Sequence, residues 1–271
     1  MSLIRRILDT LKFIFLFLYY CLEAFLMCFC TGKKKVAGQT VLVTGSANGI
    51  GRQIALNFAQ LGAVLVLWDI DEEGNEKTAK LIRSNGAQAV HTYKCDLRKK
   101  EEIYAVADQV RKEVGDVDIL INNAGIWKKK PFMELSDSDV EETLKTNTEA
   151  HFWTCKAFLP AMIAHNRGHL VTTASVAAFS GVYSSSKHAA FGFLESLTLE
   201  LRKKGKEGIK TTIVCPSYVD TRLITGLKIK PTFLLPILDV ASVGRKIVDA
   251  ILKEEFYVVL PSQARLLILK M

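Results

Sequence analysis

A serine, a tyrosine and a lysine lie close together in the stretch Ala174–Phe193, which reads ASVAAFSGVYSSSKHAAFGF. Tyr183 and Lys187 are four residues apart, so a helix would place both side chains on one face. Ser175 precedes Tyr183 by eight residues. A phenol beside an ammonium can take the proton of an alcohol, because the cation favours the phenolate and lowers the tyrosine pKa. The stretch predicts a proton-transfer site, although a lone pair of this kind is more often an ordinary exposed helix pair.

A glycine-rich turn with the sequence TGSANGIG follows a short apolar run and precedes an amphipathic stretch. Its glycines allow a tight turn and let the backbone approach a pyrophosphate, while the positive end of the following helix stabilises that anion. The turn therefore predicts a dinucleotide site. The residues expected to contact the cofactor here are Gly45, Ser46, Asn48, Gly49, Ile50 and Gly51.

Asp69 ends the next apolar run, eighteen residues after Gly51. A carboxylate at this place accepts hydrogen bonds from the ribose hydroxyls of NAD and repels the additional phosphate of NADP. No basic residue among Ser46, Ala47 and Asn48 is available to bind that phosphate. We therefore expect NAD as the cofactor, with a helix N-cap as the alternative role of Asp69.

Short β-branched runs alternate with amphipathic stretches along the chain from about residue 36. Strands are expected at 40–45, 63–69, 87–96, 118–125, 169–175, 210–216 and 256–261, and helices at 50–62, 72–84, 101–115, 138–165 and from about Tyr183 onward. Alternation of apolar strands with helices predicts a parallel sheet covered on both faces. We expect one α/β domain, a doubly wound, Rossmann-like parallel sheet over residues 36–271.

The first 35 residues differ in composition from the rest of the chain. Phe13–Cys30 reads FIFLFLYYCLEAFLMCFC, is interrupted only by Glu23 and lies between two basic clusters. Eighteen residues are barely enough for a helix to cross a bilayer, so a spanning and a monotopic anchor both stay open. A signal peptide would need a cleavage site that is not apparent here, and a buried core helix is the less favoured alternative. We expect residues 1–35 to be a hydrophobic membrane anchor.

Charge and cysteine content exclude several classes of protein. Residues 1–35 carry +4 of the net charge of +8, and the other +4 is spread over the remaining 236 residues. So diffuse an excess does not predict nucleic-acid binding. The six cysteines include no CxxC pair, so we expect neither a zinc site nor a disulfide framework. This cysteine content fits a reducing compartment.

The motifs TGSANGIG, NNAG (Asn122–Gly125), Ser175 and YSSSK together resemble the short-chain dehydrogenase/reductase superfamily, over about residues 36–261. The stretches VLWDID, KEVGDVDILINNAGI, HFWTCKAFLPAMIA and GIKTTIVCP resemble its membrane-associated branch of epidermal retinol dehydrogenase 2-like enzymes and lipid-droplet 17-beta-hydroxysteroid dehydrogenases. The resemblance implies an NAD-dependent oxidoreductase for a lipophilic alcohol, a retinoid or a steroid. It also implies a place on the endoplasmic reticulum membrane or lipid droplet, with the catalytic domain facing the cytosol, and leaves a homodimer possible.

The resemblance implies a role for each matching residue. Tyr183 would be the acid/base, Lys187 its electrostatic partner and a ribose ligand, and Ser175 the donor to the substrate oxygen. Asn147, within LKTNTEAHF, would complete a catalytic tetrad through a water relay. Further cofactor contacts are implied for Asp96, Asn123, Gly125, Pro216 and Thr221. Ser217 stands where the family usually has a glycine.

Two features leave an alternative open. Val176–Val182 supplies seven residues between Ser175 and Tyr183, where the family usually has a longer segment, and this segment normally walls the substrate pocket. The chain also ends sooner after FYVVLP than the family pattern leads us to expect. The alternative to an enzyme is therefore a catalytically weak or inactive scaffold of the same fold on a membrane or lipid droplet. The basic stretch Trp127–Lys130 is either a contact for lipid headgroups or a solvated loop.

Overall fold

The computed structural model describes residues 32–87, 89–176, 181–227, 230–232 and 235–264, together with Thr10 and Leu18. The chain divides into two units, Met1–Lys34 and Lys35–Met271, and every strand of the sheet belongs to the second. The predicted anchor falls almost wholly outside the described residues. Among the residues that are described, no helix is both long enough and apolar enough to cross a membrane.

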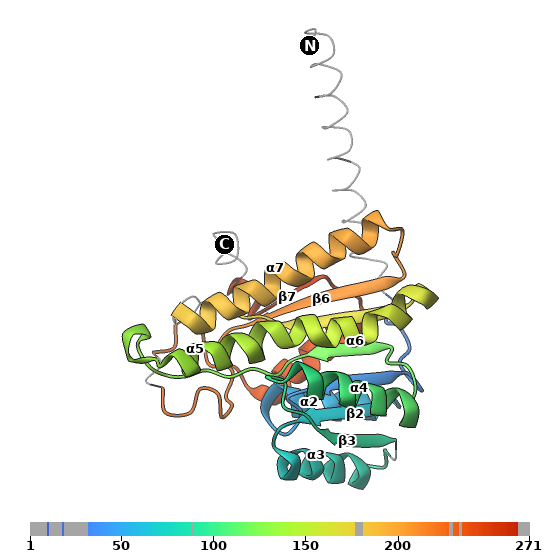
Figure 1. Cartoon of the computed structure of the whole chain (residues 1–271), viewed down its shortest axis with the longest axis horizontal. Coiled ribbons are helices and arrows are strands. Elements are labelled where there is room, and N and C mark those ends of the chain that lie inside the picture. Colours follow the sequence, from blue (N-terminus) through green and yellow to red (C-terminus); the bar gives the residue numbers. More distant parts are fainter. Residues whose placement is uncertain are drawn as a thin grey trace. The chain divides into compact units, whose positions relative to one another are not determined.

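One parallel sheet of seven strands in the order β3-β2-β1-β4-β5-β6-β7 forms the centre of the second unit (Figure 1). The strands are β1 (Thr40–Thr44), β2 (Val64–Asp69), β3 (Val90–Lys94), β4 (Ile119–Asn122), β5 (Gly168–Thr173), β6 (Ile209–Pro216) and β7 (Tyr257–Leu260). Leu42 pairs with Leu120, and neither side chain has any exposed surface. Continuous apolar runs of this kind are needed because a parallel sheet is buried on both faces.

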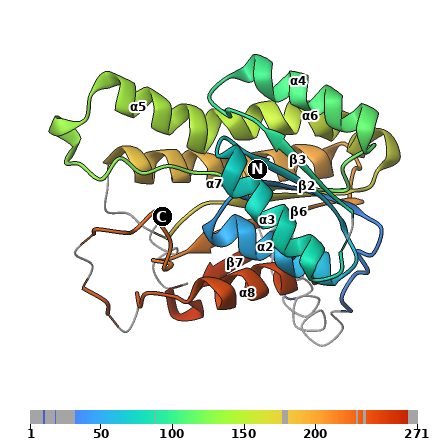
Figure 2. The same ribbon diagram turned by 90° about the horizontal axis from the view of Figure 1, so that it is seen from below.

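Helices cover the two faces of the sheet (Figure 2). One face carries α2 (Gly49–Gln60), α3 (Glu72–Ser84) and α8 (Val240–Leu252), and the other carries α4 (Lys100–Glu113), α5 (Asp137–Leu144), α6 (Ala150–His165) and α7 (Gly181–Lys203). Each face has its own apolar cluster, with Phe58 of α2 in one and Phe158 of α6 in the other. In the second cluster the rings of Phe158 and Trp68 lie 5.7 Å apart. The predicted doubly wound sheet is confirmed.

The structure differs from the predicted elements in three places. β4 ends at Asn122, so most of NNAG leaves the strand as a loop. The expected helix 138–165 is divided by a π-helical turn, η2 (Lys145–Glu149), between α5 and α6. Helix α8 was not predicted, although Asp239 caps it by accepting a hydrogen bond from Ser242 N at 2.7 Å. Short 3-10 turns, η1 (Phe132–Glu134) and η3 (Ser262–Ala264), complete the described elements.

The strand order places a crevice at the centre of one sheet edge. β1 lies between β2 and β4, so the chain reverses its direction of progress across the sheet after β3. The segments that follow β1 and β4 therefore turn toward opposite faces of the sheet, and a gap opens between them at the carboxyl ends of the strands. In open α/β sheets, ligands bind at this switch point.

Candidate active site

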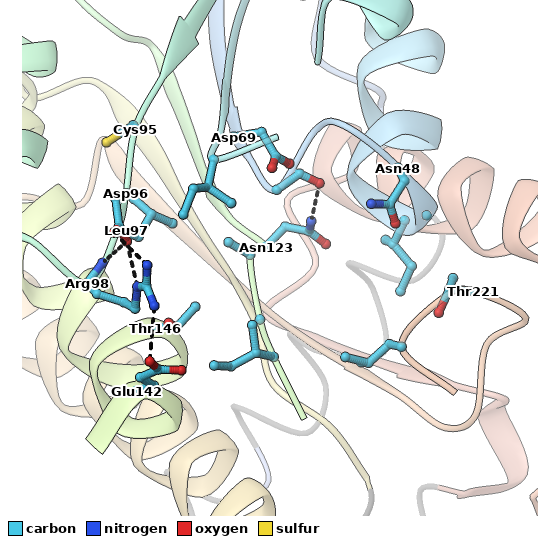
Figure 3. A pocket seen from close by; sticks show the side chains of 18 of the residues that line it. Asn48, Asp69, Cys95, Asp96, Leu97, Arg98, Asn123, Glu142, Thr146 and Thr221 are labelled. Carbon is cyan, nitrogen blue, oxygen red and sulfur yellow. Dashed lines mark hydrogen bonds and ion pairs between the residues drawn. The ribbon is translucent and has the colours of Figure 1, made fainter. Parts of the chain in front are cut away.

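Two adjoining cavities lie at the carboxyl ends of the strands. The larger, of about 540 Å³, is bordered by residues from the segments after β1, β2, β3, β4 and β6 (Figure 3). Of the predicted cofactor residues it is lined by Gly45, Asn48, Gly49, Ile50, Asp69, Asp96, Asn123, Gly125 and Thr221. The smaller, of about 80 Å³, is lined by Ser175, Tyr183, Lys187 and Pro216, and it shares Ile50, Asn123, Gly125 and Thr221 with the larger. The fold therefore gathers nearly all predicted site residues around one connected space.

Two glycines of the turn after β1, Gly45 and Gly51, have no room for a side chain. Gly45 has a φ of +70°, and a Cβ there would lie 2.8 Å from the Cα of Ala124. A Cβ on Gly51 would lie 2.0 Å from the carbonyl oxygen of Gly45. Asn48, the N-cap of α2, makes no side-chain capping bond to the first turn. A bare turn leading into a helix N-terminus fits the pyrophosphate of a dinucleotide.

Ser46 is placed differently from the other residues of this turn. Its side chain is fully buried and does not line the cavity. The hydroxyl donates to Asn75 Oδ1 at 2.7 Å, and Asn75 Nδ2 in turn donates to Leu67 O at 2.9 Å. Ser46 thus ties the glycine turn to α3 and β2, and its contact with a cofactor stays a prediction.

Asp69 faces the larger cavity, where a ribose would bind (Figure 3). Its Oδ2 accepts from Ala47 N and its Oδ1 from Asp71 N, each at 2.9 Å. Burial raises the pKa of Asp69, and these backbone N–H groups oppose that shift. The N-cap of α3 is Asp71, which accepts from Gly74 N at 2.9 Å, so the alternative role considered for Asp69 is wrong.

Ser175, Tyr183 and Lys187 converge on the smaller cavity. α7 begins at Gly181, so its first two turns carry Tyr183 and Lys187 on one face, and a hydrogen bond joins the side chains of Tyr183 and Ser175. Lys187 is 3% exposed, and its Nζ donates to Thr173 O at 2.7 Å. Four residues of the short Ser–Tyr interval, 177–180, lie outside the described residues.

The pKa values of Tyr183 and Lys187 in this cavity are shifted toward the neutral forms. Burial raises the pKa of Tyr183 to about 12; the Ser175 hydroxyl opposes this shift and Tyr218 adds to it. Burial also lowers the pKa of Lys187 to about 8. The sequence predicts a lowered tyrosine pKa, and the protein alone gives the opposite direction, because desolvation of the phenolate is the larger effect.

Asn147 lies behind the smaller cavity, in the π turn between α5 and α6. Its side chain is fully buried, and Oδ1 accepts from Ile126 N at 2.8 Å. Nδ2 donates to Ile126 O at 3.0 Å and to Ser186 Oγ at 2.9 Å. A Cβ on Gly125 would lie 3.3 Å from Asn147 Oδ1 and 3.1 Å from Lys187 Nζ. Asn147 therefore joins the loop after β4 to α7 next to the lysine.

Several residues that the sequence did not single out as site residues also belong to the site. Trp127 lines the smaller cavity and stacks on Tyr183, with ring centroids 4.9 Å apart and an interplanar angle of 21°. Arg98, Lys128 and Glu142 line the larger one. Trp127 directly follows NNAGI in the sequence. This position next to a predicted cofactor loop is the sequence signal that could have identified it as a site residue. The ion pairs of Glu142 with Arg98 and Lys128 join separate segments and have no local signature.

Comparisons with known proteins agree with this geometry. The family model for short chain dehydrogenases matches residues 39–230. Epidermal retinol dehydrogenase 2 of Mus musculus is 52% identical over 234 residues, which cover 84% of this chain and 76% of that protein. Estradiol 17-beta-dehydrogenase 11 of Mus musculus is 42% identical over 269 residues, covering 97% and 89% of the two chains.

Solved structures also resemble the described domain. A short chain dehydrogenase/reductase from Burkholderia phymatum, in complex with NAD, has a TM-score of 0.78 and 27% identity, and covers 87% of this chain and 94% of its own. A metagenomic short-chain oxidoreductase in complex with NADP has a TM-score of 0.69 and 26% identity, and covers 84% and 97%.

Proposed function

Because this chain belongs to the short chain dehydrogenase family, we propose that it is an NAD-dependent oxidoreductase that interconverts a lipophilic alcohol and its carbonyl compound at a membrane surface. The observation that carries the proposal is the convergence of Ser175, Tyr183 and Lys187 on a cavity that adjoins the glycine turn. Proton transfer and dinucleotide binding then occur side by side, as hydride transfer requires.

The reaction needs one proton and one hydride to leave the alcohol. Bound NAD would supply a nicotinamide ring that accepts the hydride of the carbinol carbon, and this ring would also carry a positive charge. Tyr183 accepts the hydroxyl proton, and the Ser175 hydroxyl holds the substrate oxygen by a hydrogen bond. Lys187 supplies positive charge next to the phenol, and Asn147 keeps the loop after β4 against α7. In the reverse direction Tyr183 returns the proton to the carbonyl oxygen.

The preference for NAD over NADP rests on Asp69. Its carboxylate lines the cavity and both of its oxygens are already oriented by backbone N–H groups. An additional phosphate on the ribose would meet this negative charge, whereas two free hydroxyls would donate to it. We propose NAD on this argument, because the similar solved structures include complexes with either cofactor.

A retinoid or hydroxysteroid is the proposed substrate class. The relatives named as retinol and estradiol dehydrogenases support it. So does the apolar lining of the smaller cavity, to which Trp127, Val219, Leu223 and Ile224 contribute. The scaffold alternative is not favoured, because the Ser175 and Tyr183 side chains meet in spite of the short interval between them.

Membrane attachment through residues 1–35 remains a proposal based on the apolar run Phe13–Cys30 and its basic flanks. Delivery of a poorly soluble alcohol from a membrane would suit such a substrate. We propose the endoplasmic reticulum membrane or a lipid droplet as the location, with residues 36–271 facing the cytosol.

A second copy of the chain is the proposed protein partner. The described surface carries an apolar groove of about 600 Å³ over α6 and α7, lined by Phe152, Trp153, Leu159, Ile163, Phe193 and Leu197. Burial of such a groove in a homodimer would remove apolar surface from water. Sedimentation of the purified protein in detergent will distinguish a monomer from a dimer.

The proposed reaction is tested with purified protein in detergent or lipid vesicles. We expect formation of NADH when retinol or estradiol is supplied with NAD, and a slower reaction with NADP. Tyr183→Phe should lose at least about a hundredfold in kcat, because the base is removed while the ring and its stacking on Trp127 stay. Equal rates for the wild type and this variant would refute the assignment of Tyr183.

A further inference from the structure

A chain of ion pairs crosses one side of the larger cavity. We call it the ion-pair rim and define it as Asp96, Arg98, Lys128, Asp139 and Glu142. Arg98 Nη2 lies 2.8 Å from Asp96 Oδ2, and its Nη1 lies 3.2 Å from Glu142 Oε1 (Figure 3). Lys128 Nζ lies 2.7 Å from Glu142 Oε2 and 3.3 Å from Asp139 Oδ1. The rim thus runs from the segment after β3, through α5, to the segment after β4.

Glu142 connects the two cations of this rim, since its Oε1 binds Arg98 and its Oε2 binds Lys128. Lys128 is also held by Asp139, so it keeps one tie to α5 without Glu142. Arg98 has no second contact with α5 among the described ion pairs and hydrogen bonds. The side chains of Arg98, Lys128 and Glu142 are 36%, 31% and 31% exposed, so solvent screens them only in part. The Lys128 ammonium lowers the pKa of Glu142, which keeps this carboxyl charged at neutral pH.

The rim borders the cofactor cavity directly, because Asp96, Arg98, Lys128 and Glu142 all line it. Arg98 also donates from Nε to Asp96 Oδ1 at 2.9 Å, so the same guanidinium that reaches α5 fixes the carboxylate expected near the adenine. The segments after β3 and β4 follow strands that are not neighbours in the sheet. Among the described residues, no backbone hydrogen bond joins the two segments.

We propose that Glu142 is a positioning residue for the dinucleotide: by holding Arg98 and Lys128 it fixes the width of the cavity at the adenosine end. This inference rests on the proposed function, since it presumes that the cavity binds a dinucleotide. Glu142 does not touch the reacting atoms. Its loss therefore changes cofactor affinity and leaves the catalytic step itself intact.

The test compares Glu142→Gln with Glu141→Gln in the full-length protein. Glu141 directly precedes Glu142 on α5, but its ion pair with Lys145 is exposed and does not line the cavity. NADH binding is measured by NADH fluorescence without substrate. We expect the Kd of Glu142→Gln to rise about two- to fivefold, the range for a partly exposed ion pair, and that of Glu141→Gln to stay unchanged. Glu142→Lys, which places a cation between two cations, should weaken NADH binding further.

Salt and kinetics separate positioning from a general loss of stability. Salt screens the ion pairs of the wild-type protein. The ratio of the NADH Kd of Glu142→Gln to that of the wild type should therefore shrink between about 0.05 M and about 0.3 M NaCl. In Glu142→Gln the KM for NAD should rise, while kcat should stay at the wild-type value. Equal Kd values for wild type, Glu142→Gln and Glu142→Lys would overturn this inference alone. A wild-type protein that binds neither NADH nor NADPH would refute the proposed function itself.

Discussion

At Lys187, folding stability and chemistry oppose each other. Its ammonium is 3% exposed and has the Thr173 carbonyl as its described hydrogen-bond acceptor. Burial lowers the pKa to about 8, which means that the folded protein holds this proton less tightly than the unfolded chain does. A charge kept at such a cost is typical of a functional site. The nearby His151 is neutral for the same reason, since burial lowers its pKa to about 3.

This conflict predicts how stability depends on pH. From about pH 8 to the unfolded pKa of 10.5, the unfolded state binds more protons at Lys187 than the folded state. The Lys187 contribution to the free energy of unfolding should therefore rise across that range, by about 3 kcal/mol. Below about pH 8 this contribution stays absent.

Lys187→Met is the variant that isolates the effect. It should lack the rise between pH 8 and 10.5, since it has no proton to lose, while all other titrating groups are shared with the wild type. Urea unfolding of both proteins at several pH values measures the difference. Parallel pH profiles would show that Lys187 is not desolvated as the structure indicates.

The glycine turn after β1 and the π turn η2 differ in how far the sequence predicts them. Gly45, Gly49 and Gly51 are predicted from sequence as a cradle, and the structure shows why two of them cannot carry a Cβ. The π turn η2 is the opposite case. It places Asn147 against Ser186 and Ile126, but the segment reads as ordinary helix, because its register depends on the contacts that α7 and the loop after β4 provide.

Gly51→Ala tests the close packing of the turn. The new methyl group would meet the Gly45 carbonyl oxygen at 2.0 Å, and backbone cannot yield as a flexible side chain can. We expect a loss of about 1–3 kcal/mol in the free energy of unfolding and weaker NADH binding. The matched control is Gly192→Ala within α7, where a Cβ would have nothing within 4 Å. That variant should gain up to about 1 kcal/mol, and an equal loss in both would contradict the packing argument.

At the scale of the whole molecule, the strand order decides where the site lies. The glycine turn is far in the sequence from Ser175 and Lys187, and they meet because β1, β4, β5 and β6 are neighbours with their carboxyl ends at one edge. The same parallel arrangement brings Arg98 and Lys128 to the two carboxylate oxygens of Glu142, Oε1 and Oε2.

The two parts of the chain lead to a prediction about location. Full-length protein should float with lipid vesicles in a density gradient, because Phe13–Cys30 is apolar and flanked by basic residues. Protein lacking residues 1–35 should stay in the soluble fraction and still bind NADH, since Val36 is the first described residue that packs in the core of the sheet domain. Flotation of both forms would show that the sheet domain itself binds lipid.

The sequence by itself determined the doubly wound sheet, the glycine turn and the Ser–Tyr–Lys set. Each of these depends on local periodicity or on residue types at short spacing, which one segment carries alone. Only the tertiary structure decided that Ser46 is buried, that Asp71 and not Asp69 caps α3, and that burial moves the pKa of Tyr183 upward. Desolvation, capping partners and ion pairs between distant segments depend on what packs around a residue, and that is settled only when the strands assemble.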